Sequence, residues 1–169
     1  MKIKYVLRSL VWIAFIFPFT TQSQSINSGS YHTAIGLRAG GTSGLTVKHF
    51  ISSGAALEGI IGIWNNAFSI TGLYEKHSGT GTAGLNWYYG GGFHVAAENN
   101  RYYRNRYYYR DYYSDGGVGI GIDGILGIEY KIIPIPFAIS LDVKPFIDVN
   151  THGGAFFSLD PGLGIKFVF

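Results

Sequence analysis

The side chains best suited to bind another molecule are arginines and tyrosines that interleave between positions 98 and 116. Four arginines and seven tyrosines fall in this stretch, against three acidic residues. Arginine forms bidentate contacts with phosphate or carboxylate, and tyrosine rings supply rigid contact area. We predict a recognition surface for anionic glycolipid headgroups, polysaccharide or a partner protein; the alternative is a solvated loop. Its residues are Arg101, Tyr102, Tyr103, Arg104, Arg106, Tyr107, Tyr108, Tyr109, Arg110, Tyr112 and Tyr113.

A second set of charged residues occurs singly, at alternate positions among glycine, alanine and serine. The set comprises Arg38, Lys48, Glu58, Glu75, Asp123, Glu129, Lys131, Asp142, Lys144, Asp148 and Lys166. Its positive and negative members nearly balance. Uncompensated charge in a narrow interior is costly, so we expect these groups to pair. The pattern predicts a salt-bridged plug, and the alternative is a polar path for a small ion.

Few residues have the types and the spacing that a catalytic site would need. Glu75, His77 and Ser78 lie close together and offer the residue types that a lipid deacylase needs. However, a histidine at such a place is more often a turn or interfacial residue than part of an active site. We therefore expect no active site and no enzymatic activity.

Metal and cofactor chemistry is not indicated either. The histidines at 32, 94 and 152 lack metal-ligand spacing. The absence of cysteine excludes a thiolate site and a disulfide framework. We expect neither a metal site nor a cofactor.

The elements that must position these side chains are β-strands, because apolar residues recur at every second position and turn residues separate the segments. The clearest alternation puts Val118, Ile120 and Ile122 on one face of a strand, opposite Gly119 and Gly121. Eight strands are expected, at 31–40, 45–51, 55–64, 67–76, 84–97, 118–132, 137–148 and in the segment ending at 169. The connection at 98–116 is the longest, and the link after 67–76 is longer than a tight turn needs.

Two architectures fit eight alternating strands. A soluble sandwich or barrel turns its apolar face inward, whereas an outer-membrane barrel turns it toward lipid. Here the polar face is mostly small residues with sparse charges, and charged residues make up only 14% of the chain against roughly 25% in soluble domains. Such a face suits the narrow bore of a small barrel. We predict an all-β, transmembrane, up-and-down antiparallel barrel.

The N-terminus predicts an export signal. Lys2, Lys4 and Arg8 precede an apolar run from Leu10 to Phe19, which is too short for a membrane-spanning helix. Small residues offer a cleavage site between Ser23 and Ser25. We expect residues 1–23 to be removed, 24–30 to form a short periplasmic segment, and 31–169 to form the barrel.

The C-terminus carries a family resemblance. The chain ends Gly-Leu-Gly-Ile-Lys-Phe-Val-Phe, and the terminal strand resembles the signal that barrel-assembly machinery reads, through Leu163, Ile165, Phe167 and Phe169. The mature chain resembles the small eight-stranded OmpA/OmpX-like outer-membrane barrels. The resemblance implies a bacterial outer-membrane location after export, periplasmic termini, and outward loops after the first, third, fifth and seventh strands.

The resemblance leaves the cellular role open. We predict a structural or adhesive protein that acts through its exposed loops, contacts outer-membrane lipid including glycolipid headgroups, and is a monomer. The alternatives are a small pore for ions or solutes, and a lipid A-modifying enzyme. An exported location argues against a nucleic-acid partner, although arginine–tyrosine interleaving also suits single-stranded nucleic acid.

Overall fold

The computed structural model describes residues 31–64, 67–98, 101–104, 111–114, 117–150 and 155–169. The predicted signal peptide (1–23) and the segment 24–30 lie outside these ranges and stay predictions. No helix in the described part of the chain is long and apolar enough to cross a membrane.

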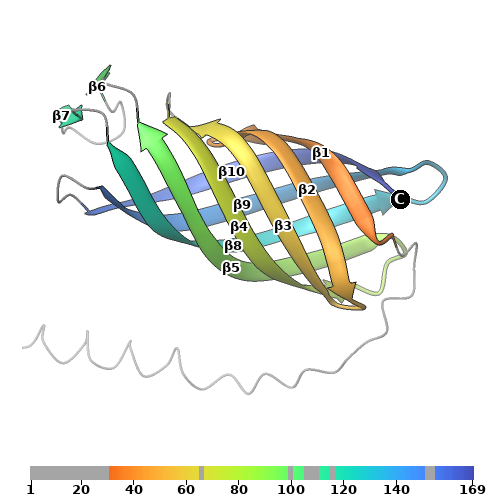
Figure 1. The fold of residues 1–169 in the computed structure, drawn as a ribbon. Coiled ribbons are helices and arrows are strands. Elements are labelled where there is room, and N and C mark those ends of the chain that lie inside the picture. The colour runs from red at the N-terminus through yellow and green to blue at the C-terminus, as the bar shows by residue number, and fades with distance from the viewer. Residues whose placement is uncertain (1–30, 65–66, 99–100, 105–110, 115–116, 151–154) are drawn as a thin grey trace, which may run out of the picture.

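Eight strands close into one antiparallel barrel in the order β1-β2-β3-β4-β5-β8-β9-β10, with β10 pairing back onto β1 (Figure 1). The strands are β1 (Thr33–Gly40), β2 (Ser43–Ser52), β3 (Ala55–Trp64), β4 (Ala67–Gly79), β5 (Leu85–Glu98), β8 (Val118–Ile132), β9 (Phe137–Asn150) and β10 (Ala155–Val168). The predicted strand number and the antiparallel barrel fold are confirmed.

The predicted strand boundaries agree with the structure to within a few residues, except at the last strand. β10 begins at Ala155, because residues 155–161 continue to pair with β9 beyond the point where β1 ends. Pro161 is tolerated there, since β1 stops at Gly40 and the Pro161 carbonyl accepts a hydrogen bond from Gly41 N at 3.1 Å.

The link after the predicted strand 67–76 is longer than a tight turn needs because β4 extends beyond residue 76. β4 continues through His77 to Gly79, so the connection to β5 contains only residues 80–84. Gly81 and Gly84 have φ of 87° and 82°, which side chains rarely permit. The Thr80 hydroxyl donates to the Leu85 carbonyl at 3.0 Å and fixes the turn.

The predicted long loop contains a hairpin of its own. β6 (Arg101–Arg104) and β7 (Asp111–Ser114) pair antiparallel as a separate two-stranded sheet, with Tyr102 opposite Tyr113. Figure 1 shows this hairpin beyond the tips of β5 and β8.

The two ends of the barrel differ, and we name them for what they carry. The terminal end holds the start of β1, the C-terminus and the turns at 53–54, 80–84 and 133–136. Phe169 helps to close the barrel at this end. Its backbone N–H donates to the Thr33 carbonyl and its carbonyl accepts from the Thr33 N–H, both at 2.9 Å. The loop end holds the connections at 41–42, 65–66, 99–117 and 151–154.

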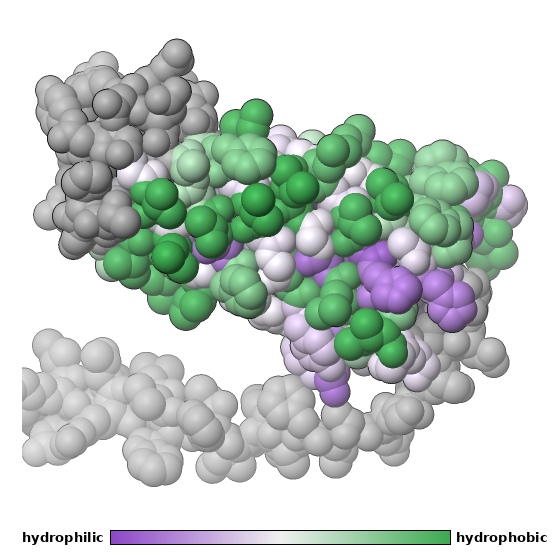
Figure 2. All heavy atoms as spheres, in the orientation of Figure 1, coloured by the Kyte–Doolittle hydropathy of each residue, from purple (hydrophilic) through white to green (hydrophobic). Residues whose placement is uncertain are grey.

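Burial in this barrel is the reverse of that in a soluble protein. Outward apolar side chains are exposed, as at Leu37 (57%) and Phe93 (67%), whereas Arg38 (3%) and Lys48 (0%) are buried inside. Figure 2 shows hydrophobic side chains spread over the face of the barrel that is in view, with a few polar ones among them. The core of the molecule is therefore its bore, and the core is largely polar.

Aromatic side chains gather on the outer wall near the terminal end. The exposed members of this belt are Tyr74, Trp87, Tyr130, Phe137, Phe167 and Phe169. Phe68 and Phe157 lie on this wall toward the loop end. Aromatic residues at both edges of an apolar wall are typical of barrels that cross a bilayer.

Candidate functional site

The candidate site is the bore, where buried charged side chains form two groups. The terminal cluster contains Lys48, Glu58, Glu75, Glu129 and Lys166. The loop cluster contains Arg38, His94, Asp123, Asp142, Lys144, Asp148 and Asp160. Alternation along each strand turns all of them inward, because their neighbours in sequence face outward.

The terminal cluster is centred on Lys48, which is fully buried. Its Nζ lies 2.8 Å from Glu75 Oε2, 2.9 Å from Glu58 Oε2 and 3.3 Å from Glu129 Oε2. Lys166 Nζ adds a contact to Glu58 Oε1 at 3.0 Å. A buried ammonium needs such compensation, since breaking a buried pair leaves an uncompensated charge.

A row of aromatic rings lies beside this cluster. Tyr31, Phe50, His77 and Tyr88 follow one another with centroid separations of 5.1, 4.8 and 4.9 Å. The Tyr31 hydroxyl donates to Glu129, and Lys48 Nζ lies 4.3 Å from the Tyr88 ring centroid. The strand predicted over 31–40 includes Tyr31, but β1 begins only at Thr33, so Tyr31 does not follow the alternation of that strand.

Arg38 organises the loop cluster. Its Nη2 lies 2.6 Å from Asp142 Oδ1, and its Nη1 lies 3.1 Å from Asp160 Oδ2. Nη1 also donates to the Thr42 carbonyl at 2.9 Å. Arg38 therefore ties β1 to β9, to β10 and to the β1–β2 turn.

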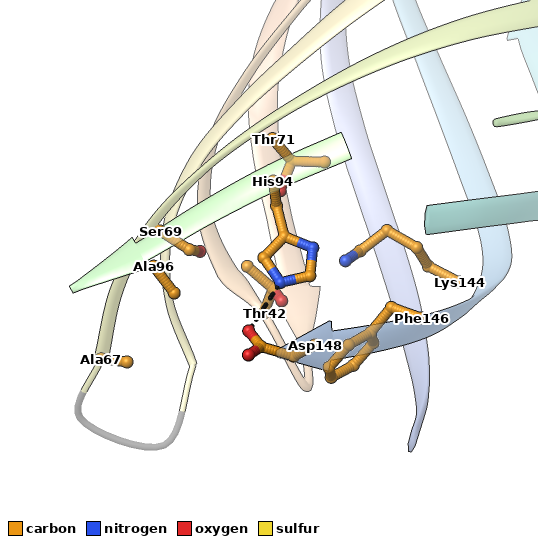
Figure 3. A pocket seen from close by; sticks show the side chains of 9 residues that line it. All are labelled: Thr42, Ala67, Ser69, Thr71, His94, Ala96, Lys144, Phe146 and Asp148. Atoms are coloured by element: carbon orange, nitrogen blue, oxygen red, sulfur yellow. Dashed lines mark hydrogen bonds and ion pairs between the residues drawn. The ribbon is translucent and has the colours of Figure 1, made fainter. Parts of the chain in front are cut away.

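Lys144 and His94 complete the loop cluster through a shared carboxylate. Lys144 Nζ lies 2.8 Å from Asp123 Oδ1, and His94 Nδ1 lies 2.8 Å from Asp123 Oδ2. His94 Nε2 lies 2.9 Å from Asp148 Oδ2 (Figure 3). Because ionised carboxylates only accept hydrogen bonds, both ring nitrogens donate, as in an imidazolium.

A small cavity opens beside His94 at the loop end. It has a volume of about 20 Å³ and is lined by polar and small side chains. Figure 3 shows these residues, which are Thr42, Ala67, Ser69, Thr71, His94, Ala96, Lys144, Phe146 and Asp148. That volume suits a water molecule or two.

A short apolar layer accompanies the two charged groups. Ile60, Leu73, Tyr88 and Ile125 are buried together inside the bore. The Tyr88 hydroxyl donates to Asp142 Oδ2 at 3.3 Å and so links this layer to the loop cluster.

Glycines make room for the large inward side chains. Gly127 is the cross-strand partner of Tyr88, and a Cβ on Gly127 would collide with the phenol ring. Gly121 is the partner of His94, and a Cβ there would collide with the imidazole. The abundance of glycine on the inward face therefore follows from the size of the side chains opposite it.

The balance of positive and negative side chains in the bore differs from the near balance predicted from the sequence. Lys131 lies outside both clusters, because its Nζ donates to the carbonyls of Ile132 and Ile135 in the turn after β8. Asp160, which the sequence analysis did not select, is fully buried in the loop cluster. The described bore therefore holds four lysine and arginine side chains against seven carboxylates, and His77 and His94 lie against the excess acids.

Three buried polar atoms have no hydrogen-bond partner in the described structure, namely Arg38 Nε, Glu75 Oε1 and His77 Nδ1. Among the described residues, no group of three or more histidine, aspartate or glutamate side chains is arranged to hold a metal ion.

The candidate deacylase residues do not assemble. His77 Nε2 lies 2.9 Å from Glu75 Oε2 inside the bore. Ser78 is the next residue in the same strand, so its side chain faces the outer wall. The base and the nucleophile are therefore on opposite faces of β4.

The other predicted sites are described only in part. Of the arginine- and tyrosine-rich surface, Arg101–Arg104, Tyr112 and Tyr113 lie on the β6–β7 hairpin, and 105–110 lie outside the described residues. Leu163, Ile165, Phe167 and Phe169, the predicted assembly signal, all face outward and are exposed.

The fold and bore define a small closed barrel with an apolar wall and an ion-paired interior. No family model and no curated protein matches this chain. A solved structure that is similar is the crystal structure of the N-terminal β-barrel domain of Pseudomonas aeruginosa OprF. The TM-score is 0.51 at 16% identity, over 81% of this chain and 95% of that one. At this identity the likeness shows the fold, and it agrees with the predicted eight-stranded type.

Proposed function

We propose that this protein is an outer-membrane β-barrel with a closed bore, which acts as a structural and adhesive element of the cell envelope. The observation that carries the proposal is the reversed burial: apolar side chains coat the outside, and Arg38 and Lys48 lie inside. In water such a surface would be exposed at a large cost, whereas in lipid it is the favourable arrangement.

The closed bore is supported by its contents. The aromatic row from Tyr31 to Tyr88, the two ion-pair clusters and the apolar layer around Ile60 lie in contact with one another in the interior. The cavity beside His94 has a volume of about 20 Å³, which is less than a hydrated ion needs. We therefore favour a plug over a pore.

The adhesive role rests on the β6–β7 hairpin. Outward loops face the cell exterior in barrels of this type, and the hairpin lies at the loop end. Its sequence alternates arginine with tyrosine, a composition suited to anionic glycolipid headgroups, polysaccharide or protein. Export, cleavage near residue 23 and contact with the barrel-assembly machinery belong to the same proposal.

Membrane insertion is tested by fractionation and by gel mobility. The expressed protein should cofractionate with outer membranes and migrate faster on a gel when unboiled than when boiled. A processed protein that stays soluble in the periplasm, with no mobility change on boiling, would contradict the placement.

The closed bore is tested by planar-bilayer recording of the refolded protein. We expect no steady unitary current, and a stable conductance would favour the pore alternative. Mass analysis of lipid A with and without expression tests the enzymatic alternative, and an unchanged lipid A pattern is expected.

A further inference from the structure

The outer wall of the barrel carries one full charge among the described strand residues, and it belongs to Lys76. Lys76 faces outward on β4, on the same side as Ile70 and Tyr74, and it is exposed. A lysine that faces lipid is costly near the bilayer centre and nearly neutral at the interface. Lys76 lies near the terminal end of β4, where the aromatic belt also lies.

The strand register places similar groups beside Lys76 on β4 and β5, whereas its partner on β3 is Ala55. Tyr89 on β5 is its direct partner, and Trp87 on β5 is the partner of Ser78. Tyr74 and Ser78 occupy the neighbouring outward positions on β4. We call these five residues the Lys76 patch: Tyr74, Lys76, Ser78, Trp87 and Tyr89.

Every polar group of the Lys76 patch can donate a hydrogen bond. They are one ammonium, one indole N–H and three hydroxyls. None of the five side chains has a hydrogen-bond or ion-pair partner within the described part of the chain, and the Trp87 and Tyr89 rings stack at 5.3 Å. Glu75, the acid next to Lys76 in sequence, is buried in the bore and bound to Lys48.

A cluster of unpaired donors around one cation is suited to an anion, and its place on the outer wall limits the source of that anion. We propose that the Lys76 patch binds the phosphate of an anionic phospholipid in the leaflet at the terminal end. The ammonium pairs with the phosphate, and the hydroxyls and indole donate to phosphate or glycerol oxygens. This inference rests on the membrane placement proposed above.

The expected headgroup is phosphatidylglycerol rather than phosphatidylcholine. Both carry a phosphate, but choline brings a second positive charge beside Lys76, which opposes binding. Tyrosine and tryptophan prefer the headgroup level of a bilayer, so the rings hold the ammonium at the depth of the phosphate.

The test compares two lysines at the same end of the barrel. Lys76→Gln and Lys131→Gln each remove one positive charge, but Lys131 Nζ already donates to the Ile132 and Ile135 carbonyls, at 2.8 and 2.9 Å. Each variant is reconstituted into vesicles of phosphatidylcholine mixed with phosphatidylglycerol and extracted gently. Native mass spectrometry then measures the lipid retained.

We expect the wild-type protein and Lys131→Gln to retain phosphatidylglycerol in preference to phosphatidylcholine. Lys76→Gln should retain it about tenfold less, as for the loss of one charge-assisted contact. Lys76→Arg should restore retention, and Tyr89→Phe should lower it by a smaller factor.

Two results would overturn the proposal. Equal loss in Lys76→Gln and Lys131→Gln would show general attraction between charges, and equal retention of both lipids by the wild-type protein would show no site. The boiling-dependent gel shift in the same vesicles reports insertion separately. A protein that never inserts contradicts the membrane placement, whereas an inserted protein without lipid preference contradicts only the Lys76 patch.

Discussion

The phenol oxygen of Tyr88 lies 3.3 Å from Oδ2 of Asp142, and this hydrogen bond connects the two charged halves of the bore. On the terminal side, Lys48 lies over the Tyr88 ring and His77 stacks on it. On the loop side, Asp142 is held by Arg38. Tyr88 thus couples two ion-pair clusters that have no other hydrogen bond or ion pair between them in the described structure.

Removing the Tyr88 hydroxyl tests this coupling. Tyr88→Phe keeps the ring and its contacts but deletes the donor to Asp142, so we expect the free energy of unfolding to fall by about 1 kcal/mol. Urea titration of the refolded protein in lipid vesicles measures it. Asp142, the carboxylate that loses this donor, keeps its ion pair with Arg38, so a loss of several kcal/mol would mean that the clusters depend on Tyr88 more than the geometry indicates.

The close packing of Gly127 against the Tyr88 ring provides a second test. Gly127→Ala places a methyl group against the phenol, and overpacking of this kind costs about 1–3 kcal/mol. Gly59→Ala is the matched control, because a Cβ at Gly59 has no heavy atom within 4 Å. Equal effects of the two substitutions on urea unfolding would show that strand propensity, rather than contact with Tyr88, explains the loss.

Much of the architecture could be predicted from alternation, because every second residue of a strand faces the same side. Ile120 and Ile122 face outward for the same reason that Gly121 and Asp123 face the bore. β3 and β8 have the predicted bounds. The sequence analysis set no start for the last strand, which begins at Ala155, and Asp160 within it binds Arg38 and Thr42 inside the barrel.

The pairing within the bore was less predictable. Alternation indicates which residues face inward, but it does not indicate which of them meet across the bore. Arg38 meets Asp160 across 122 positions of sequence, and Tyr31 reaches Glu129 from outside any strand. Lys131 was expected among the paired charges, but its place at the end of β8 brings it to the turn carbonyls instead.

Arg38 closes the seam between β1 and β10, so its removal should be severe. Arg38→Met leaves Asp142 and Asp160 buried without their main cation, and loss of one member of a buried ion pair costs about 3–5 kcal/mol. Unfolding in urea, followed by the gel shift, measures the loss. The added changes Asp142→Asn and Asp160→Asn should recover part of the stability; if they make it worse, the two aspartates have a separate structural role.

The β6–β7 hairpin offers a test that leaves the barrel untouched. Changing all four arginines of the loop to serine removes its bidentate donors while keeping the tyrosines and the strands of the barrel. We expect binding of cells or purified barrel to anionic glycolipid surfaces to fall by about tenfold or more, because each lost charge-assisted contact weakens binding. The residues are Arg101, Arg104, Arg106 and Arg110.

The folding and stability of the barrel serve as the control for that experiment. The arginine-to-serine variant should keep the wild-type gel shift and urea midpoint, because β6 and β7 pair only with each other in the described structure. Binding that survives all four substitutions would reject the loop as the adhesive surface. The Lys76 patch lies at the opposite end of the barrel, so its retention of phosphatidylglycerol should be the same in this variant, and a change there would show that the substitutions had disturbed the whole fold.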